Sequence, residues 1–90
     1  MIIESLEWDD ENVEHIARHG VNPDEVEDVC SGLNISEKQG NRRYILSGQS
    51  REGRYLNIVV ETISEGFFRP ITAYQMNEVQ KARYRKRMGK

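Results

Sequence analysis

The sequence is poor in the residues that build disulfide frameworks, zinc centres and membrane spans. It has one cysteine, Cys30, so it forms no intramolecular disulfide and cannot assemble a cysteine-rich zinc site. It has no run of 18 apolar residues, which excludes a hydrophobic membrane-spanning helix and argues against a membrane partner. The N-terminal segment MIIESLEWDD has neither a basic flank nor a cleavage motif, so we expect no signal peptide and a cytoplasmic protein.

Signals for metal and cofactor sites are also scarce. His15 and His19 are spaced to share one helical face, but no third ligand is evident and the glutamate of an HExxH motif is absent. There is no glycine-rich phosphate loop and no nucleophile motif. We therefore expect no metal and no cofactor, and a small-molecule enzyme is disfavoured. The 90 residues predict one domain spanning residues 1–90, since compact domains typically contain about 100–150.

The small net charge of −2 conceals an uneven distribution. Residues 1–30 contain ten acidic side chains and a single basic one, whereas residues 31–90 contain twelve basic and five acidic side chains. A basic half suits a phosphate backbone, and an acidic half suits a basic partner. The two halves can equally attract each other within the fold, and this interpretation does not exclude the other two.

The pattern of apolar residues predicts an α+β fold with the element order β-α-α-β-β-β-β-α. We expect an antiparallel meander with helices on one face: the sheet packs against two N-terminal helices, and a basic helix follows at the C-terminus. The predicted strands cover residues 2–8, 33–37, 43–48, 55–63 and 67–74. The predicted helices follow Asp9, Asn22 and Asn77.

Each predicted helix has a recognisable start. Asp9, Asn22 and Asn77 are good N-cap residues, and Glu25 and Gln80 complete capping boxes in the second and third helices. Glycine ends the first two helices, at positions 20 and 32. A narrow apolar stripe in the first helix consists of Val13, Ile16 and Ala17, and the second helix is expected to face the core with Val26, Val29 and Cys30. The apolar content of the third helix is thin: Met76, Val79, Ala82 and Met88.

The strand over residues 55–63 has two different faces. Leu56, Ile58 and Val60 make one face fully apolar, whereas Asn57 and Glu61 interrupt the other. The last strand contains Pro70, which cannot donate to a sheet ladder. This strand is therefore predicted to be an edge strand or to carry a bulge.

Three segments resemble the BrnT-type toxins of bacterial toxin–antitoxin pairs. The first segment, LEWDDENVEHIARHGVNPDEVEDV, resembles the family's WD, K/R-HG-[VI] and capped second helix. The second, NRRYILSGQSREGRYLNIVV, resembles its strand–loop–strand. The third, FRPITAYQMNEVQKARY, resembles its closing R-x-I-[ST]-A-R segment. The matching positions are Trp8, Asp9, Arg18, His19, Gly20, Val21, Glu25, Arg43, Gly48, Ser50, Gly53, Arg54, Leu56, Arg69, Ile71, Thr72, Ala73 and Tyr84.

The resemblance implies a RelE-like fold and a metal-independent endoribonuclease that arrests translation. It also implies a ribbon-helix-helix antitoxin that blocks the enzyme. The complex of the two represses their shared promoter, so the toxin contacts promoter DNA only through this complex. Three positions depart from the family. The family's basic residue early in the first helix is missing here, where Glu11 or Asn12 stands nearby. Tyr74 replaces an arginine, and Gln80 replaces a frequent glutamate. Tyr74 and Gln80 favour an alternative, a non-catalytic RelE-like module that acts in partner binding, RNA binding or promoter repression.

The chemistry of RNA cleavage without a metal selects candidate residues independently. The reaction needs a base for the 2′-hydroxyl proton, a cation for the phosphorane and an acid for the leaving oxygen. Arginine suits the cation role because its planar fork pairs with two phosphate oxygens. We expect Arg69 in this role first, followed by Arg43 and Arg83, on one concave patch at the last strand. The candidates for proton transfer are Glu61, His19, Tyr74 and Tyr84.

Further basic residues are predicted to bind RNA: Arg54, Lys81, Arg85, Lys86 and Arg87. Structural roles compete with several of these assignments. His19 suits a helix end, Glu61 can pair with an arginine across strands, and Tyr84 can pack its ring on the sheet.

Overall fold

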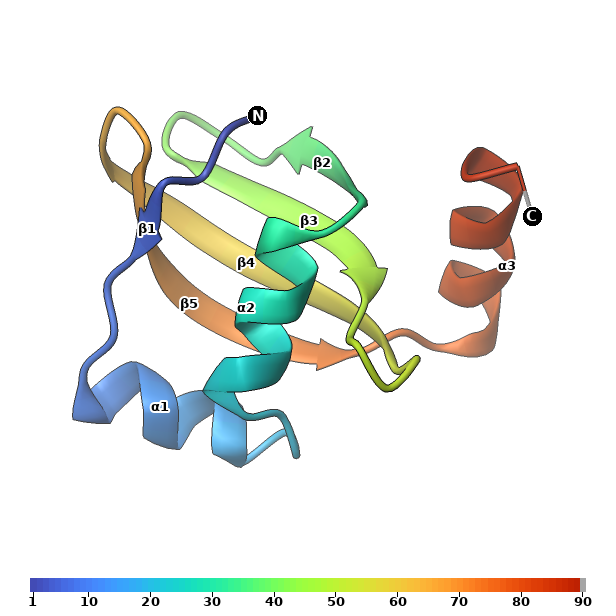
Figure 1. Cartoon of the computed structure of the whole chain (residues 1–90), viewed down its shortest axis with the longest axis horizontal. Helices are drawn as coiled ribbons and strands as arrows, with labels where there is room; N and C mark the ends of the chain where they lie inside the picture. Colours follow the sequence, from blue (N-terminus) through green and yellow to red (C-terminus); the bar gives the residue numbers. More distant parts are fainter. Residues whose placement is uncertain (90) are drawn as a thin grey trace.

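A computed structural model describes residues 1–89 and shows a five-stranded sheet with three helices (Figure 1). The α+β class predicted from the sequence is confirmed. The strands are β1 (Ser5–Leu6), β2 (Asn34–Lys38), β3 (Arg43–Gln49), β4 (Tyr55–Ser64) and β5 (Phe67–Gln75). The helices are α1 (Asp10–Ala17), α2 (Pro23–Ser31) and α3 (Glu78–Arg87).

The sheet has the strand order β1-β5-β4-β3-β2 and is mixed rather than purely antiparallel. Strands β2 to β5 form the predicted antiparallel meander, and β1 adds to the β5 edge in parallel. Only Ser5 and Leu6 pair with β5, so the predicted strand over residues 2–8 was too long. Ile2 lies outside the pairing and is 80% exposed.

Helices α1 and α2 form the core with one face of the sheet, α1 against β5 and α2 against β3 and β4. The predicted alternation in β4 is confirmed, because Leu56, Ile58 and Val60 are fully buried in this core. In α1 the predicted apolar stripe is only partly correct: Ile16 is buried, but Ala17 is exposed. The buried neighbour is instead Asn12, whose amide donates to the Glu7 carbonyl oxygen at 3.0 Å.

The last strand bulges beside its proline, as predicted. Val59 lies opposite Thr72 and Val60 lies opposite Pro70, so Ile71 is the extra residue in β5. The bulge allows a residue without an N–H group to lie in a strand that is paired on both sides at its start.

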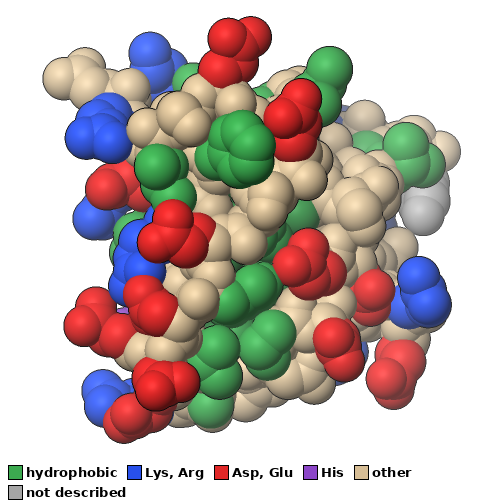
Figure 2. All heavy atoms as spheres, turned by 60° about the vertical axis from the view of Figure 1, so that its left-hand side comes forward, with side chains coloured by type: hydrophobic (Ala, Val, Ile, Leu, Met, Phe, Trp, Pro, Cys, Tyr) green, Lys and Arg blue, Asp and Glu red, His purple; other side chains and the backbone are tan. Residues whose placement is uncertain are grey.

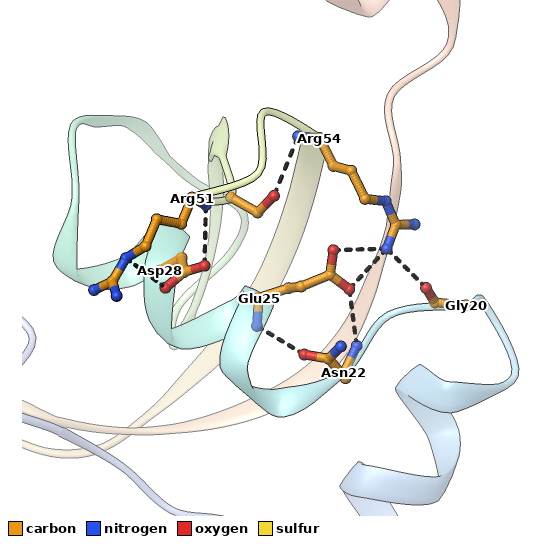
Figure 3. A network of polar contacts seen from close by, with 7 residues as sticks. Gly20, Asn22, Glu25, Asp28, Arg51 and Arg54 are labelled. Carbon is orange, nitrogen blue, oxygen red and sulfur yellow. Dashed lines mark hydrogen bonds and ion pairs between the residues drawn. The ribbon is translucent and has the colours of Figure 1, made fainter.

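Ion pairs join the acidic N-terminal part of the chain to the basic part. Arg54 Nη1 donates to both carboxylate oxygens of Glu25, at 2.7 and 2.6 Å, and to the Gly20 carbonyl oxygen at 3.0 Å (Figure 3). The Arg51 backbone N–H donates to the Asp28 carboxylate at 3.0 Å in the same region. The interpretation that the two halves attract each other within the fold therefore holds here.

Helix α3 does not share the face occupied by α1 and α2, contrary to the expectation that the helices lie on one face (Figure 1). Its anchor is Tyr84, which is 4% exposed and meets the ring of Tyr55 edge to face. Val79, one of the few apolar residues of this helix, is 66% exposed. None of the helices described in residues 1–89 has the length and apolar content that a membrane span requires.

Candidate functional site

A groove lies where α3 meets the sheet face that α1 and α2 leave uncovered, here called the open face. Its volume is about 140 Å³, below the roughly 300–1,000 Å³ of typical small-molecule pockets. The lining residues come from β2 to β5, the β5–α3 connection and α3: Ile35, Glu37, Ile45, Ser47, Asn57, Tyr74, Met76, Gln80, Arg83, Tyr84 and Arg87. A small, open groove of this kind suits part of an extended ligand better than an enclosed small molecule.

A row of polar side chains crosses the floor of the groove. Asn57 lies opposite Ser47 on β3 and opposite Tyr74 on β5. The Ser47 hydroxyl donates to Asn57 Oδ1 at 2.7 Å. Directly opposed residues of antiparallel strands have Cβ atoms about 4.5–5.5 Å apart, so the three side chains are immediate neighbours.

Helix α3 supplies the opposite wall. Arg87 forms an ion pair with Glu37 of β2, which joins the helix to the edge strand. Arg83 is exposed, and it makes no hydrogen bond or ion pair with any residue in the described part of the chain. Burial raises the pKa of Tyr84, so its hydroxyl stays protonated at neutral pH. The groove therefore combines one unpaired guanidinium with two tyrosines.

A second polar cluster lies further along β4. Arg43 Nε donates to Glu61 Oε2 at 3.0 Å, and Arg69 lies opposite Glu61 on the other flanking strand. Glu61 is four residues beyond Asn57, which places their Cα atoms about 13 Å apart along the strand. The single patch expected from the sequence is thus divided between the groove and this cluster.

The guanidinium of Arg69 is occupied by acidic residues at the start of α1. It pairs with Asp9, the N-cap residue, and its Nη2 lies 3.5 Å from Glu11 Oε1. Asp9 raises the pKa of Arg69, and the guanidinium in turn lowers the pKa of Asp9. Arg69 therefore connects β5 to α1 rather than extending as a free cation into the groove.

The remaining candidates are spread over other surfaces. His19 is exposed just beyond α1, where its ring meets that of His15 with centroids 5.5 Å apart. The Arg54 guanidinium is paired with Glu25 of α2 (Figure 3), so it stabilises the fold. Arg85 and Lys81 lie over the ring of Tyr55, with Arg85 Cζ 5.0 Å and Lys81 Nζ 5.8 Å from its centroid. Lys86 is exposed on α3.

Sequence reasoning missed Ser47 and Asn57 as site residues. The available signal was the polar interruption of an otherwise apolar strand at Asn57 and again at Glu61. These two residues mark the groove and the second cluster, respectively.

Acidic side chains outnumber basic ones on the side of the molecule that carries β1 and α1 (Figure 2). Exposed carboxylates there include Glu7, Asp10, Glu11 and Glu14. This side suits a basic partner, whereas a polyanion is better accommodated beside the basic helix α3.

No three His, Cys, Asp or Glu side chains among residues 1–89 gather closely enough to hold a metal ion. The chain matches no family model, and no curated protein matches it as a relative.

Proposed function

We propose that this chain is a metal-independent endoribonuclease with a RelE-like fold, acting as the cytoplasmic toxin of a BrnT-type toxin–antitoxin pair. The observation that carries the proposal is the groove between the open face and α3. It unites Tyr74, Arg83 and Tyr84, three residues that the chemistry of RNA cleavage selects from the sequence.

The shape and charge of the groove favour RNA over a small molecule. The groove is small and open, and one of its walls is a helix whose last turn carries Arg85, Lys86 and Arg87. Basic side chains on one wall bind a phosphate backbone, and tyrosine rings bind bases by stacking. An RNA strand can then run across the open face toward Arg43 and Glu61.

Each proposed role follows from the local surroundings of the residue. Arg83 is the cation for the phosphorane, because its guanidinium is free of carboxylates among residues 1–89. The protonated hydroxyl of Tyr84 donates the proton to the leaving oxygen, and the Tyr74 oxygen takes the proton of the 2′-hydroxyl. Glu61 and Arg43 already neutralise each other, so they contact the neighbouring part of the RNA and take no part in cleavage.

The proposed partner is a small ribbon-helix-helix antitoxin, and promoter DNA is reached only through the complex of toxin and antitoxin. The acidic side that carries α1 supports a partner with a basic segment. No membrane partner is proposed.

A second candidate is the non-catalytic module that binds RNA or a protein partner. A specific observation favours it: Arg43, Arg69 and Arg87 are all paired with carboxylates, so only part of the arginine set is available to a phosphate. Tyr74 also stands where the related toxins carry an arginine.

Expression of the chain in a bacterium separates the two candidates. The toxin predicts growth arrest with transcript cleavage, relieved when a small ribbon-helix-helix protein encoded beside this chain is co-expressed. Arg83→Ala should abolish the arrest, whereas Arg51→Ala, at an arginine that is 90% exposed and does not line the groove, should preserve it. Harmless expression together with tight complex formation would favour the non-catalytic module.

A further inference from the structure

Asn57 has an unusual combination of burial and an unused donor. The residue is 5% exposed and lies on the floor of the groove. Its Oδ1 accepts from Ser47, and its amide nitrogen Nδ2 makes no hydrogen bond with any of residues 1–89. No fully buried side-chain nitrogen or oxygen in this part of the chain lacks a partner. Nδ2 must therefore reach the surface, and the surface that Asn57 lines is the groove.

Ser47 fixes the orientation of this amide. Because the Ser47 hydroxyl donates to Oδ1, the carbonyl end of the amide is turned toward β3 and the NH₂ end away from it. The opposite neighbour is Tyr74, whose ring is half-buried and forms no ring contact within residues 1–89. An oriented donor thus lies beside an unpartnered aromatic ring.

We propose that Asn57 and Tyr74 form a base-reading subsite that reads C4 of a pyrimidine or C6 of a purine, and selects a keto oxygen at that position, as in uracil or guanine, over an amino group, as in cytosine or adenine. This inference rests on the proposed function, because it names the substrate preference of the same groove. The base stacks on Tyr74, and its keto oxygen accepts from Asn57 Nδ2. An amino group at that position brings two donors together and leaves both without an acceptor.

The volume of the groove agrees with this assignment. The groove measures about 140 Å³ and is open to solvent, so a base can enter it by one edge. The ribose and phosphate then remain at the open mouth, within reach of α3.

The test is equilibrium binding of the full chain to 2′-O-methyl oligouridine and oligocytidine, measured by fluorescence anisotropy. These ligands lack the nucleophilic 2′-hydroxyl, so binding is measured without cleavage. Uracil has a keto oxygen at C4, where cytosine has an amino group. The wild-type chain should bind oligouridine about fivefold more tightly, the effect of one net hydrogen bond.

Two variants and one control sharpen the comparison. Asn57→Asp keeps the acceptor for Ser47 but replaces the donor with a carboxylate oxygen, so the preference should reverse toward oligocytidine. Ser47→Ala frees the amide to rotate, so the ratio of affinities should fall toward one, and this variant carries the test if Asn57→Asp fails to fold. Asn41→Asp makes the same charge change in the exposed turn between β2 and β3 and should preserve the wild-type ratio.

The possible failures are distinguishable. Equal wild-type affinity for the two oligonucleotides, or an unchanged ratio in Asn57→Asp and Ser47→Ala, would overturn the base-reading subsite while leaving RNA binding intact. Binding of neither oligonucleotide would overturn the proposed function and the subsite with it. Loss of antitoxin binding in Asn57→Asp, with the oligonucleotide ratio unchanged, would assign the groove to a peptide instead.

Discussion

The rings of Tyr55 and Tyr84 meet edge to face with their centroids 5.8 Å apart, and this contact joins α3 to the open face of the sheet. Tyr84 is the one residue of α3 that is buried. The helix is otherwise highly polar, so its position depends on the ring of Tyr84 more than on its other apolar residues.

We predict that Tyr84→Ala destabilises the protein by about 3 kcal/mol, the lower end of the range for truncating a buried aromatic side chain. Tyr84→Phe keeps the ring, so its effect should stay below about 1 kcal/mol. Urea denaturation followed by circular dichroism measures both changes. Equal stability of Tyr84→Ala and wild type would show that α3 is held by other contacts.

The pair formed by Arg54 and Glu25 should be important for stability, because Glu25 is buried and loses its counter-charge when the arginine is removed. We predict that Arg54→Met destabilises the fold by about 3 kcal/mol, near the lower limit for breaking a buried ion pair. The matched control is Arg51→Met, whose guanidinium is exposed and 3.9 Å from Asp28. This control should change the free energy of unfolding by less than about 0.5 kcal/mol.

Asp9 links the fold to pH. Its pKa is lowered in the folded state by the hydrogen bond from Arg69, so its contribution to stability is present above its unfolded pKa, near pH 4. That contribution is lost as the pH falls below about 4 and through the lower folded pKa. Asp9→Asn retains an N-cap residue but has no charge, so its thermal stability should fall less steeply in this range. Parallel pH profiles of the two proteins would contradict the assignment.

Cys30 should be unreactive in the folded protein. Burial raises its pKa to about 12, and only the thiolate attacks a disulfide reagent. We expect an aromatic disulfide such as DTNB to react with the native chain at pH 8 only at the rate of unfolding, and to react at once in 6 M guanidinium chloride. Rapid labelling of the native chain would show that α2 opens locally.

Local signals predicted much of the fold correctly. The N-caps at Asp9, Asn22 and Asn77, the bulge at Pro70 and the buried face of β4 all follow from short-range chemistry. The parallel pairing of β1 could not be predicted in this way, because it joins residues about 60 positions apart through two residue pairs.

The candidate site was less accessible from the sequence for a related reason. The irregular strand predicts a catalytic role for Arg69, but its role depends on Asp9, which lies far away along the chain. The sequence shows Asn57 only as a polar interruption of an apolar strand, because its role in the groove depends on the Ser47 hydroxyl across the sheet. The chemistry of RNA cleavage alone points to Tyr74, Arg83 and Tyr84 in the sequence, and all three line the groove.

The most direct test of the account is cleavage of a single-stranded RNA by the purified chain in EDTA. We predict cleavage without a metal, a rate lower by about a hundredfold in Arg83→Ala, the typical effect of removing a group that stabilises transition-state charge, and an unchanged rate in Arg51→Ala. Absence of cleavage by the wild-type chain, or equal rates in wild type and Arg83→Ala, would contradict it.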